Sequence, residues 1–317
     1  WLKSSASLGS VPSCNLVCCC KVSSVMPWRS GTLIRVLVAV GILALSSVSL
    51  SKPSRLASEG AVCFTAGLEN MPEGTPRLYG YEHSHYTVRC RMALGLKRVP
   101  YRMTWVAEDD EETPMRLVGK KITPIIEFPG EKAMPESSDI IERVEANEAW
   151  GPRMLKEQTD RPELDAWVKT LSVPMRNLGR PRYIRSAVLP EFHSASARAR
   201  FVTTHPLPDP VTGETLSKAD WAALPKEKRD AVYQHYWDDS EAQLAKLNSA
   251  LAALDDKLIA SDGHVSSHGL SWDDIVFFSR LRGLTMIRGI QMPSSLEAYL
   301  ETMSEKTDIP LLSQLAL

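Results

Sequence analysis

Cysteine is nearly missing from the part of the chain that is expected to fold. The 317 residues include six cysteines, and only Cys90 lies beyond residue 63. One cysteine cannot form an internal disulfide, so a disulfide framework is excluded for the folded region in any compartment. The cysteines at 18–20 have no His/Cys pair at zinc-site spacing, and we expect no metal cofactor.

Acidic residues are missing from residues 1–58, which contain six Lys or Arg and fourteen serines. Arg29 and Arg35 precede an apolar run at 36–45, the arrangement of a signal-peptide n-region and h-region. Ten residues at helical rise cannot cross roughly 30 Å of hydrocarbon, so we expect no stable membrane span in the mature protein. The serine-rich stretch 46–58 is also typical of a transit peptide.

We therefore expect residues 1–70 to form a largely disordered leader that directs the protein to an organelle or the secretory route, including a plastid-type two-step address. Because the first residue is Trp1, we expect translation to start at Met26; a cytoplasmic location is the alternative if the leader is not translated. The net charge is −1, and removing the +6 of the leader leaves about −7. That balance favours no nucleic-acid partner.

Residue patterns after the leader predict two structural regions. We expect a β-α-β, then α, then β-β-α order, with strands at 77–81, 99–106, 123–128 and 132–134 and helices at 86–97 and 136–147. A polar linker at 148–162 follows. The remainder is helical in pattern, with helices expected at 163–178, 191–203, 228–258, 272–288 and 295–305. A connection rich in proline at 205–226 separates two of them.

From about residue 77 onward the chain resembles the two-domain, transferase-sized glutaredoxins of bacteria, the glutaredoxin 2 type. The matching blocks are RLYGY at 77–81, ETPMRLVG at 112–119, ITPII at 122–126, MPESSDI at 134–140, LSWDDI at 270–275 and RLRGLT at 280–285. The resemblance implies a glutathione transferase-like two-domain fold. Its parts would be an α/β thioredoxin-like domain at 71–147 and an all-α domain at 163–317.

The resemblance also implies a glutathione site. In the family the peptide between Thr123 and Pro124 is cis and faces the cysteinyl part of glutathione. Glu136 and Ser137 begin a helix whose hydroxyl, amide and dipole would hold the γ-glutamyl carboxylate. Tyr86 is a further expected contact. Taken alone, Glu136 and Ser137 are more typical of a plain helix cap; together with Thr123, Pro124 and the strand order they favour the glutathione site.

Ser84 stands where the family carries the first cysteine of a C-P-Y-C motif, because the chain reads SHYT at 84–87. An alcohol cannot undergo thiol–disulfide exchange. A serine hydroxyl could instead donate a hydrogen bond to the sulfur of glutathione, as in serine-type glutathione transferases, and Tyr81 is the second candidate. We therefore predict transferase-type chemistry on an unknown small electrophile. The alternatives are a glutathione-binding or scaffold protein without turnover and, less favoured, a disulfide oxidoreductase.

Other residues with reactive side chains are expected to be structural. His83 and His85 flank Ser84, but no acidic residue can be identified to orient either ring, and His85 is expected to be exposed. Cys90, six residues after Ser84, should point away from the loop. Ser271 and Asp274 have the spacing of a capping box, and Trp221 is expected to pack on its own domain.

Overall fold

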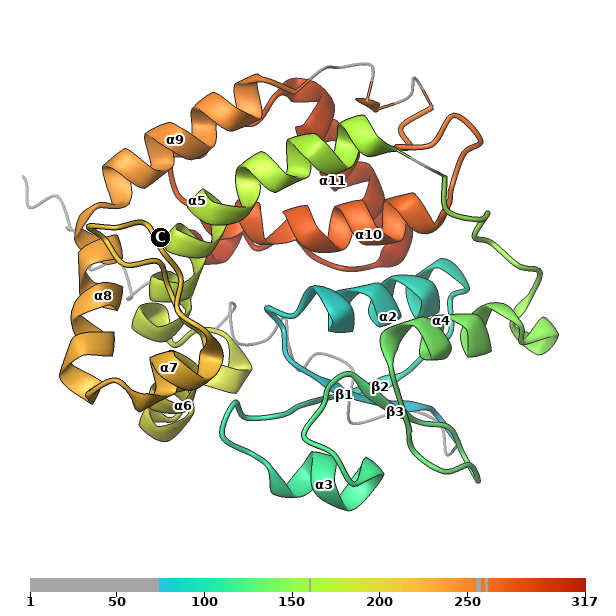
Figure 1. Cartoon of the computed structure of the whole chain (residues 1–317). Helices are drawn as coiled ribbons and strands as arrows, with labels where there is room; N and C mark the ends of the chain where they lie inside the picture. The colour runs from blue at the N-terminus through green and yellow to red at the C-terminus, as the bar shows by residue number, and fades with distance from the viewer. Residues whose placement is uncertain (1–73, 160, 255–257, 260–261) are drawn as a thin grey trace, which may run out of the picture. The chain divides into compact units, whose positions relative to one another are not determined.

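The computed structural model describes residues 74–159, 161–254, 258–259 and 262–317, which all belong to one compact unit of the chain. The leader expected over residues 1–70, with its targeting signals, lies outside these ranges. The described part begins with a small mixed sheet and its helices, and the remainder is mostly helical (Figure 1). In these ranges no helix is long and apolar enough to cross a membrane.

The sheet has four strands in the order β2-β1-β3-β4. β1 pairs in parallel with β2 and antiparallel with β3, which pairs antiparallel with β4. The element order is the β-α-β, α, β-β-α order that the sequence predicts: β1 (Arg77–Gly80), α2 (His85–Leu96), β2 (Arg102–Trp105), α3 (Glu112–Val118), β3 (Ile125–Glu127), β4 (Met134–Pro135) and α4 (Ser137–Glu145).

Helices cover both faces of this sheet, with α2 and α4 on one face and α3 on the other (Figure 1). Neighbouring strand residues point to opposite faces. Leu78 and Ile126 accordingly pack in the cluster that holds α2 and α4, whereas Tyr79 and Ile125 pack against α3. The two central strands, β1 and β3, are therefore apolar on both sides, as expected for a sheet between two helical layers.

The rest of the described chain is helical. After η2 (Glu148–Trp150) its elements are α5 (Pro162–Ser186), η3 (Pro190–Phe192), α6 (Ala195–Thr204), α7 (Lys218–Ala223), α8 (Lys226–Asp238), α9 (Ser240–Ala252), α10 (Trp272–Leu281), η5 (Arg282–Met286), α11 (Ser294–Thr307) and η6 (Ser313–Leu315). The predicted capping box is present at the start of α10, where Ser271 and Asp274 bond each other's backbone.

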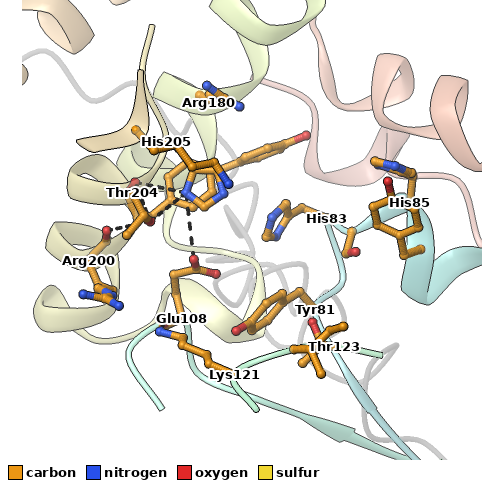
Figure 2. Close-up of a pocket in the computed structure, with 16 residues that line it drawn as sticks. Tyr81, His83, His85, Glu108, Lys121, Thr123, Arg180, Arg200, Thr204 and His205 are labelled. Atoms are coloured by element: carbon orange, nitrogen blue, oxygen red, sulfur yellow. Dashed lines mark hydrogen bonds and ion pairs between the residues drawn. The ribbon is translucent and has the colours of Figure 1, made fainter. Parts of the chain in front are cut away.

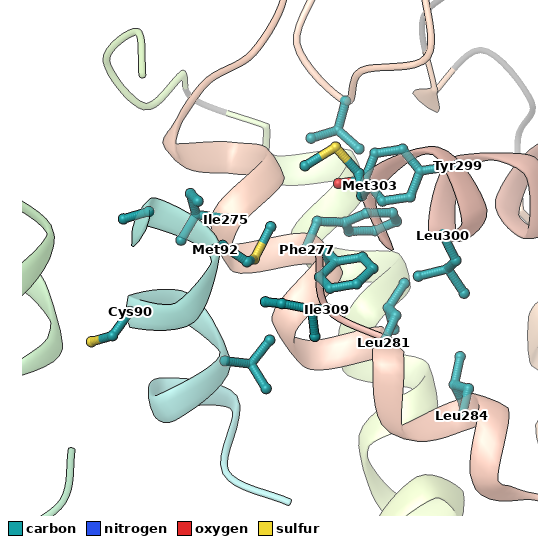
Figure 3. Close-up of a cluster of buried hydrophobic side chains, with 14 of the residues drawn as sticks. Cys90, Met92, Ile275, Phe277, Leu281, Leu284, Tyr299, Leu300, Met303 and Ile309 are labelled. Atoms are coloured by element: carbon teal, nitrogen blue, oxygen red, sulfur yellow. The ribbon is translucent and has the colours of Figure 1, made fainter. Parts of the chain in front are cut away.

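Helix α2 joins the sheet to the helical remainder, because it packs against α4 on one side and against α10 and α11 on the other. Met92 lies in the same buried cluster as Ile275, Phe277 and Met303 (Figure 3). Gly95 permits a close approach to α11, since a Cβ at this position would overlap the Thr307 carbonyl. One continuous core therefore fixes the start of α2, where Ser84 lies.

The prediction of a single helix over 228–258 is wrong. The structure has two helices, α8 and α9, which are separated at Asp239. Ser240 turns its hydroxyl back to the Trp237 carbonyl at 2.7 Å, and the Asp239 carboxylate accepts from Gln243 at 2.7 Å. Short polar side chains of this kind compete with the helical backbone for hydrogen bonds and end a helix.

The proline-rich connection at 205–226 contains a short helix, α7, that the sequence patterns do not predict. Ser217 caps this short helix by accepting from the Asp220 amide at 3.1 Å. Trp221 is buried and donates from Nε1 to the Val202 carbonyl at 2.7 Å, so it packs on the helical part as expected. At the predicted helix 191–203 the structure has η3 and then α6.

Candidate functional site

Ser84 lies between the end of β1 and the first residue of α2. Its backbone is extended, and its carbonyl accepts a hydrogen bond from the Val88 amide at 3.0 Å. Among the described residues, the hydroxyl caps no amide of α2, and the first turn of this helix contains no acidic residue. Ser84 therefore presents a hydroxyl at the positive end of the helix dipole, where negative charge is stabilised.

The residues predicted to hold glutathione lie on neighbouring elements. The Thr123–Pro124 peptide is cis, as the resemblance implies. Glu136 has a φ of 70°, a left-handed value that few residues with a side chain adopt, and Ser137 is the first residue of α4. The cis peptide and the helix start that the resemblance implies are both present.

A pocket of about 510 Å³ opens beside Ser84. Figure 2 shows Tyr81, Thr123 and His205 among the side chains that line it. It brings together four of the predicted site residues, Tyr81, Ser84, Tyr86 and Thr123. The other three, Pro124, Glu136 and Ser137, are described by the structure but do not line this pocket. The opposite wall comes from α5, α6 and the residue after α6. No sequence pattern singled out its residues: Arg180, Tyr183, Arg200, Phe201, Thr204 and His205.

His83 is held by a carboxylate from the helical part of the chain, which corrects the expectation that no acidic residue orients it. Its Nδ1 and its backbone amide both lie within hydrogen-bond distance of Glu191 Oε1, at 2.6 and 2.9 Å. Glu191 is fully buried, and its other oxygen has no hydrogen-bond partner among the described residues. The His83 ring also stacks on Tyr81 at 5.6 Å, so the loop that carries Ser84 is fixed to η3.

Glu108 and His205 form the polar side of the pocket. Burial raises the pKa of the Glu108 carboxyl, and burial, together with the nearby charge of Arg180, lowers the pKa of His205 to about 3. His205 Nδ1 is 3.9 Å from Glu108 Oε1 (Figure 2). Because this histidine is neutral at pH 7, the contact is not an ion pair.

Two aromatic side chains beside Ser84 are shielded from water. Burial, reinforced by Glu108 and Glu191, raises the pKa of the Tyr81 hydroxyl, which therefore remains a proton donor. His85 is half-buried rather than exposed as predicted, because it lies against the Tyr86 ring at 4.0 Å. Burial and the charges of two nearby arginines lower the pKa of His85 to about 4.

A buried charge cluster lies directly behind the loop. Glu82 is fully buried; its Oε2 accepts from Arg91 Nη1 at 2.7 Å, and its Oε1 accepts from Arg282 Nη2. Arg282 also donates to the Pro310 carbonyl at 2.8 Å. The cluster therefore connects the residue before His83 both to α2 and to the C-terminal helical region.

Cys90 lies outside the pocket. It is fully buried on α2, and its thiol is directed to the Ser137 carbonyl at 3.8 Å. Figure 3 shows it on the side of α2 opposite to Met92. Burial raises the pKa of this thiol, so it remains protonated and unreactive at neutral pH. The described ranges contain no group of three or more His, Cys, Asp or Glu side chains that could hold a metal ion.

Comparison with known proteins gives a consistent result. The family model described as the N-terminal domain of glutathione S-transferase matches residues 78–153, and the one described as the C-terminal domain of glutaredoxin 2 matches residues 214–316. Glutaredoxin 2 of Escherichia coli K12 is 32% identical over 244 residues, which cover 76% of this chain and 100% of that protein.

A solved structure agrees with the sequence match. Glutaredoxin 2 from Salmonella typhimurium, in complex with glutathione, superposes with a TM-score of 0.63 at 29% identity and covers 77% of this chain and all of that one. The small mixed sheet followed by a mostly helical remainder is the glutathione transferase-like two-domain fold of these proteins. The chain belongs to the glutaredoxin 2 family.

Proposed function

We propose that this protein binds glutathione and uses it in transferase-type chemistry, with Ser84 stabilising the glutathione thiolate. Support for glutathione binding comes from the Salmonella relative, whose structure contains glutathione. Thr123 and Pro124 would contact the cysteinyl part. Glu136 and Ser137, at the positive end of α4, would hold the γ-glutamyl carboxylate.

The observation that carries the chemical proposal is the position of Ser84. Its hydroxyl stands at the start of α2, beside Thr123 in the same pocket, and caps none of the described amides of that helix. A hydrogen bond to a charged group contributes roughly 1.5–3 kcal/mol. Since one pKa unit corresponds to about 1.4 kcal/mol, Ser84 could lower a thiol pKa by one to two units.

The reaction that follows is nucleophilic substitution or addition. The glutathione thiol loses its proton to water, and the sulfur forms a bond with the electrophilic carbon of a small second substrate. In a substitution the leaving group departs with the electron pair of the broken bond; in an addition the electron pair of the broken π bond takes up a proton from water. Tyr81 stays protonated beside Ser84, so its hydroxyl is a second hydrogen-bond donor for the same sulfur.

Glutaredoxin-type exchange is disfavoured by the same geometry. That reaction needs a thiolate which attacks a disulfide sulfur. Cys90 is the one cysteine among the described residues, and it is fully buried away from the pocket. We therefore expect the folded part of the protein to show no disulfide reduction that depends on Cys90.

Three variants of the full chain test the proposal. Ser84→Ala should abolish glutathione conjugation but leave glutathione affinity nearly unchanged. Ser84→Cys should create reduction of glutathione mixed disulfides, because the helix dipole would favour the new thiolate. Ser138→Ala is the matched control, since Ser138 is an exposed serine that bonds only Asp139 among the described residues.

The outcomes separate the candidate functions. Glutathione binding without conjugation in the wild type would indicate a binding or scaffold protein. Failure to bind glutathione in isothermal titration would contradict both functions. If the wild type reduces disulfides and the Cys90→Ser variant keeps this activity, the argument that disfavours glutaredoxin-type exchange is wrong.

A further inference from the structure

A second pocket of about 360 Å³ adjoins the first. The two pockets share His83, His85, Arg180 and Tyr183, so the second also opens beside the loop that carries Ser84. Its remaining walls are the middle of α5 and the segment from the end of α10 through η5. A molecule in this pocket would therefore lie next to the reacting sulfur of the proposed function.

Arginine dominates the charge of the second pocket. Arg176, Arg180 and Arg280 line it, and no Asp or Glu is among its described lining residues. Within the described ranges, neither Arg176 nor Arg180 forms an ion pair; Arg176 donates only a long hydrogen bond of 3.4 Å to Thr215, and Arg180 donates to the Pro206 carbonyl. Arg280 is 3.8 Å from Asp165, which is an exposed carboxylate.

The guanidinium groups of Arg176 and Arg180 are partly removed from water and have no carboxylate partner among the described residues, whereas Arg280 is exposed. Arg176 Nε is buried and has no hydrogen-bond partner among the described residues. Burial lowers the pKa of both Arg176 and Arg180. A buried cation without a counter-ion is destabilising, and such groups are usually paired or serve to bind a charged ligand. A carboxylate accepts two parallel hydrogen bonds from one guanidinium and would remove this cost.

Besides the arginines, the lining contains the polar side chains of Ser172, Ser279 and the two histidines, together with four aliphatic side chains. Val168 and Met175 from α5 face the pocket together with Leu281 and Ile287 from the opposite wall. A pocket that combines aliphatic walls with a few convergent polar groups is typical of a small-molecule site, where the polar groups fix the orientation of the ligand. The lining therefore fits an apolar body that carries one acidic group.

We propose that the second pocket binds the electrophilic second substrate, and that this substrate is a small organic anion with an aromatic or aliphatic body. Arg176 and Arg280 hold its acidic group, while Val168, Met175, Leu281 and Ile287 contact its carbon skeleton. That this anion is the second substrate rests on the proposed function; that the pocket selects an apolar anion rests on its own residues.

Binding is tested with two probes that differ in charge, 2-naphthoate and 2-naphthamide, by calorimetric titration into the full chain with and without glutathione. Naphthoate should bind at least about tenfold more tightly than the amide. Arg176→Met and Arg280→Met should each weaken naphthoate about three- to tenfold and leave the amide unchanged. Lys169→Met, which removes an exposed charge from the same helix outside both pockets, should change neither probe.

Equal affinity for naphthoate and naphthamide would overturn the inference, because the pocket would then not discriminate by charge. A loss of naphthoate affinity in Lys169→Met equal to that in Arg176→Met would also overturn it, because the preference would then be only a long-range charge effect. If naphthoate is preferred but glutathione does not bind, the proposed function fails and the anion pocket stands. With glutathione bound, conjugation of 4-chloro-3-nitrobenzoate should show a higher kcat/KM than conjugation of the neutral 4-chloro-3-nitrobenzamide. Arg176→Met should reduce this difference about three- to tenfold.

Discussion

Replacing Glu82 with glutamine is expected to destabilise the fold strongly while it preserves the shape of the side chain. Glu82 is fully buried between Arg91 and Arg282, and both guanidinium groups are themselves buried. The variant leaves two buried cations side by side without a carboxylate. Removing one partner of a buried ion pair costs about 3–5 kcal/mol, and we expect this range for Glu82→Gln.

The companion variant Arg282→Met should lower the free energy of unfolding by less than Glu82→Gln does. Here Glu82 keeps Arg91 as its partner, so one ion pair of 2.7 Å remains in place. The main loss is the hydrogen bonding of Arg282 to Glu82 and to Pro310, and we expect about 1–3 kcal/mol. An exposed reference pair is Arg153 and Glu142, for which Glu142→Gln should cost less than about 1 kcal/mol.

Urea unfolding followed by circular dichroism measures the change in the free energy of unfolding for all three variants. The dependence of that free energy on urea concentration should be the same in each variant and in the wild type. The Glu82 contribution should also depend on pH. Burial alone would raise the pKa of this carboxyl, but the two guanidinium groups outweigh burial and lower it. The stabilisation is therefore present above the unfolded-state pKa near 4.5 and is lost as the pH falls through the lower folded value. A cost in Glu82→Gln as small as in Glu142→Gln, or one below that of Arg282→Met, would refute this reasoning.

Two further predictions concern the glutathione site and the buried thiol. Ser137→Ala should weaken glutathione binding by roughly 1–2 kcal/mol, the loss of one hydrogen bond to a charge, in calorimetric titration; an unchanged affinity would mean that Ser137 only begins the helix. Cys90 should resist iodoacetamide in the native protein and react after denaturation, as read by peptide mass spectrometry, because it is fully buried. Rapid native labelling of Cys90 would contradict its placement.

Local sequence signals predicted much of the fold. The β-α-β, α, β-β-α order, the capping box at Ser271 and Asp274, and the burial of Trp221 follow from short-range patterns of apolar and capping residues, and the structure has all three. The break at Asp239 was missed because the apolar periodicity continues across it. Helix α5 was predicted too short, since it runs to Ser186 through internal prolines that usually end a helix.

The walls of the pockets could not be predicted in the same way. Glu191 holds His83 across 108 positions of sequence, and no local pattern distinguishes it from a solvated glutamate. Arg176 and Arg180 of α5 are equally ordinary in sequence. They become notable only because the structure partly buries them with no carboxylate partner among the described residues. Side chains that meet through tertiary packing carry no periodic signal. Ser84, Tyr81, Tyr86 and Thr123 could therefore be selected from sequence, and the wall formed by α5 and α6 could not.

The central claim is that the Ser84 hydroxyl stabilises the thiolate of bound glutathione. Ultraviolet difference spectroscopy of the thiolate band, recorded as a function of pH at saturating glutathione, measures the pKa of the bound thiol directly. The wild type should lower this pKa by one to two units relative to free glutathione, and Ser84→Ala should return most of that shift while glutathione still binds. An equal pKa of bound glutathione in the wild type and in Ser84→Ala would contradict the account.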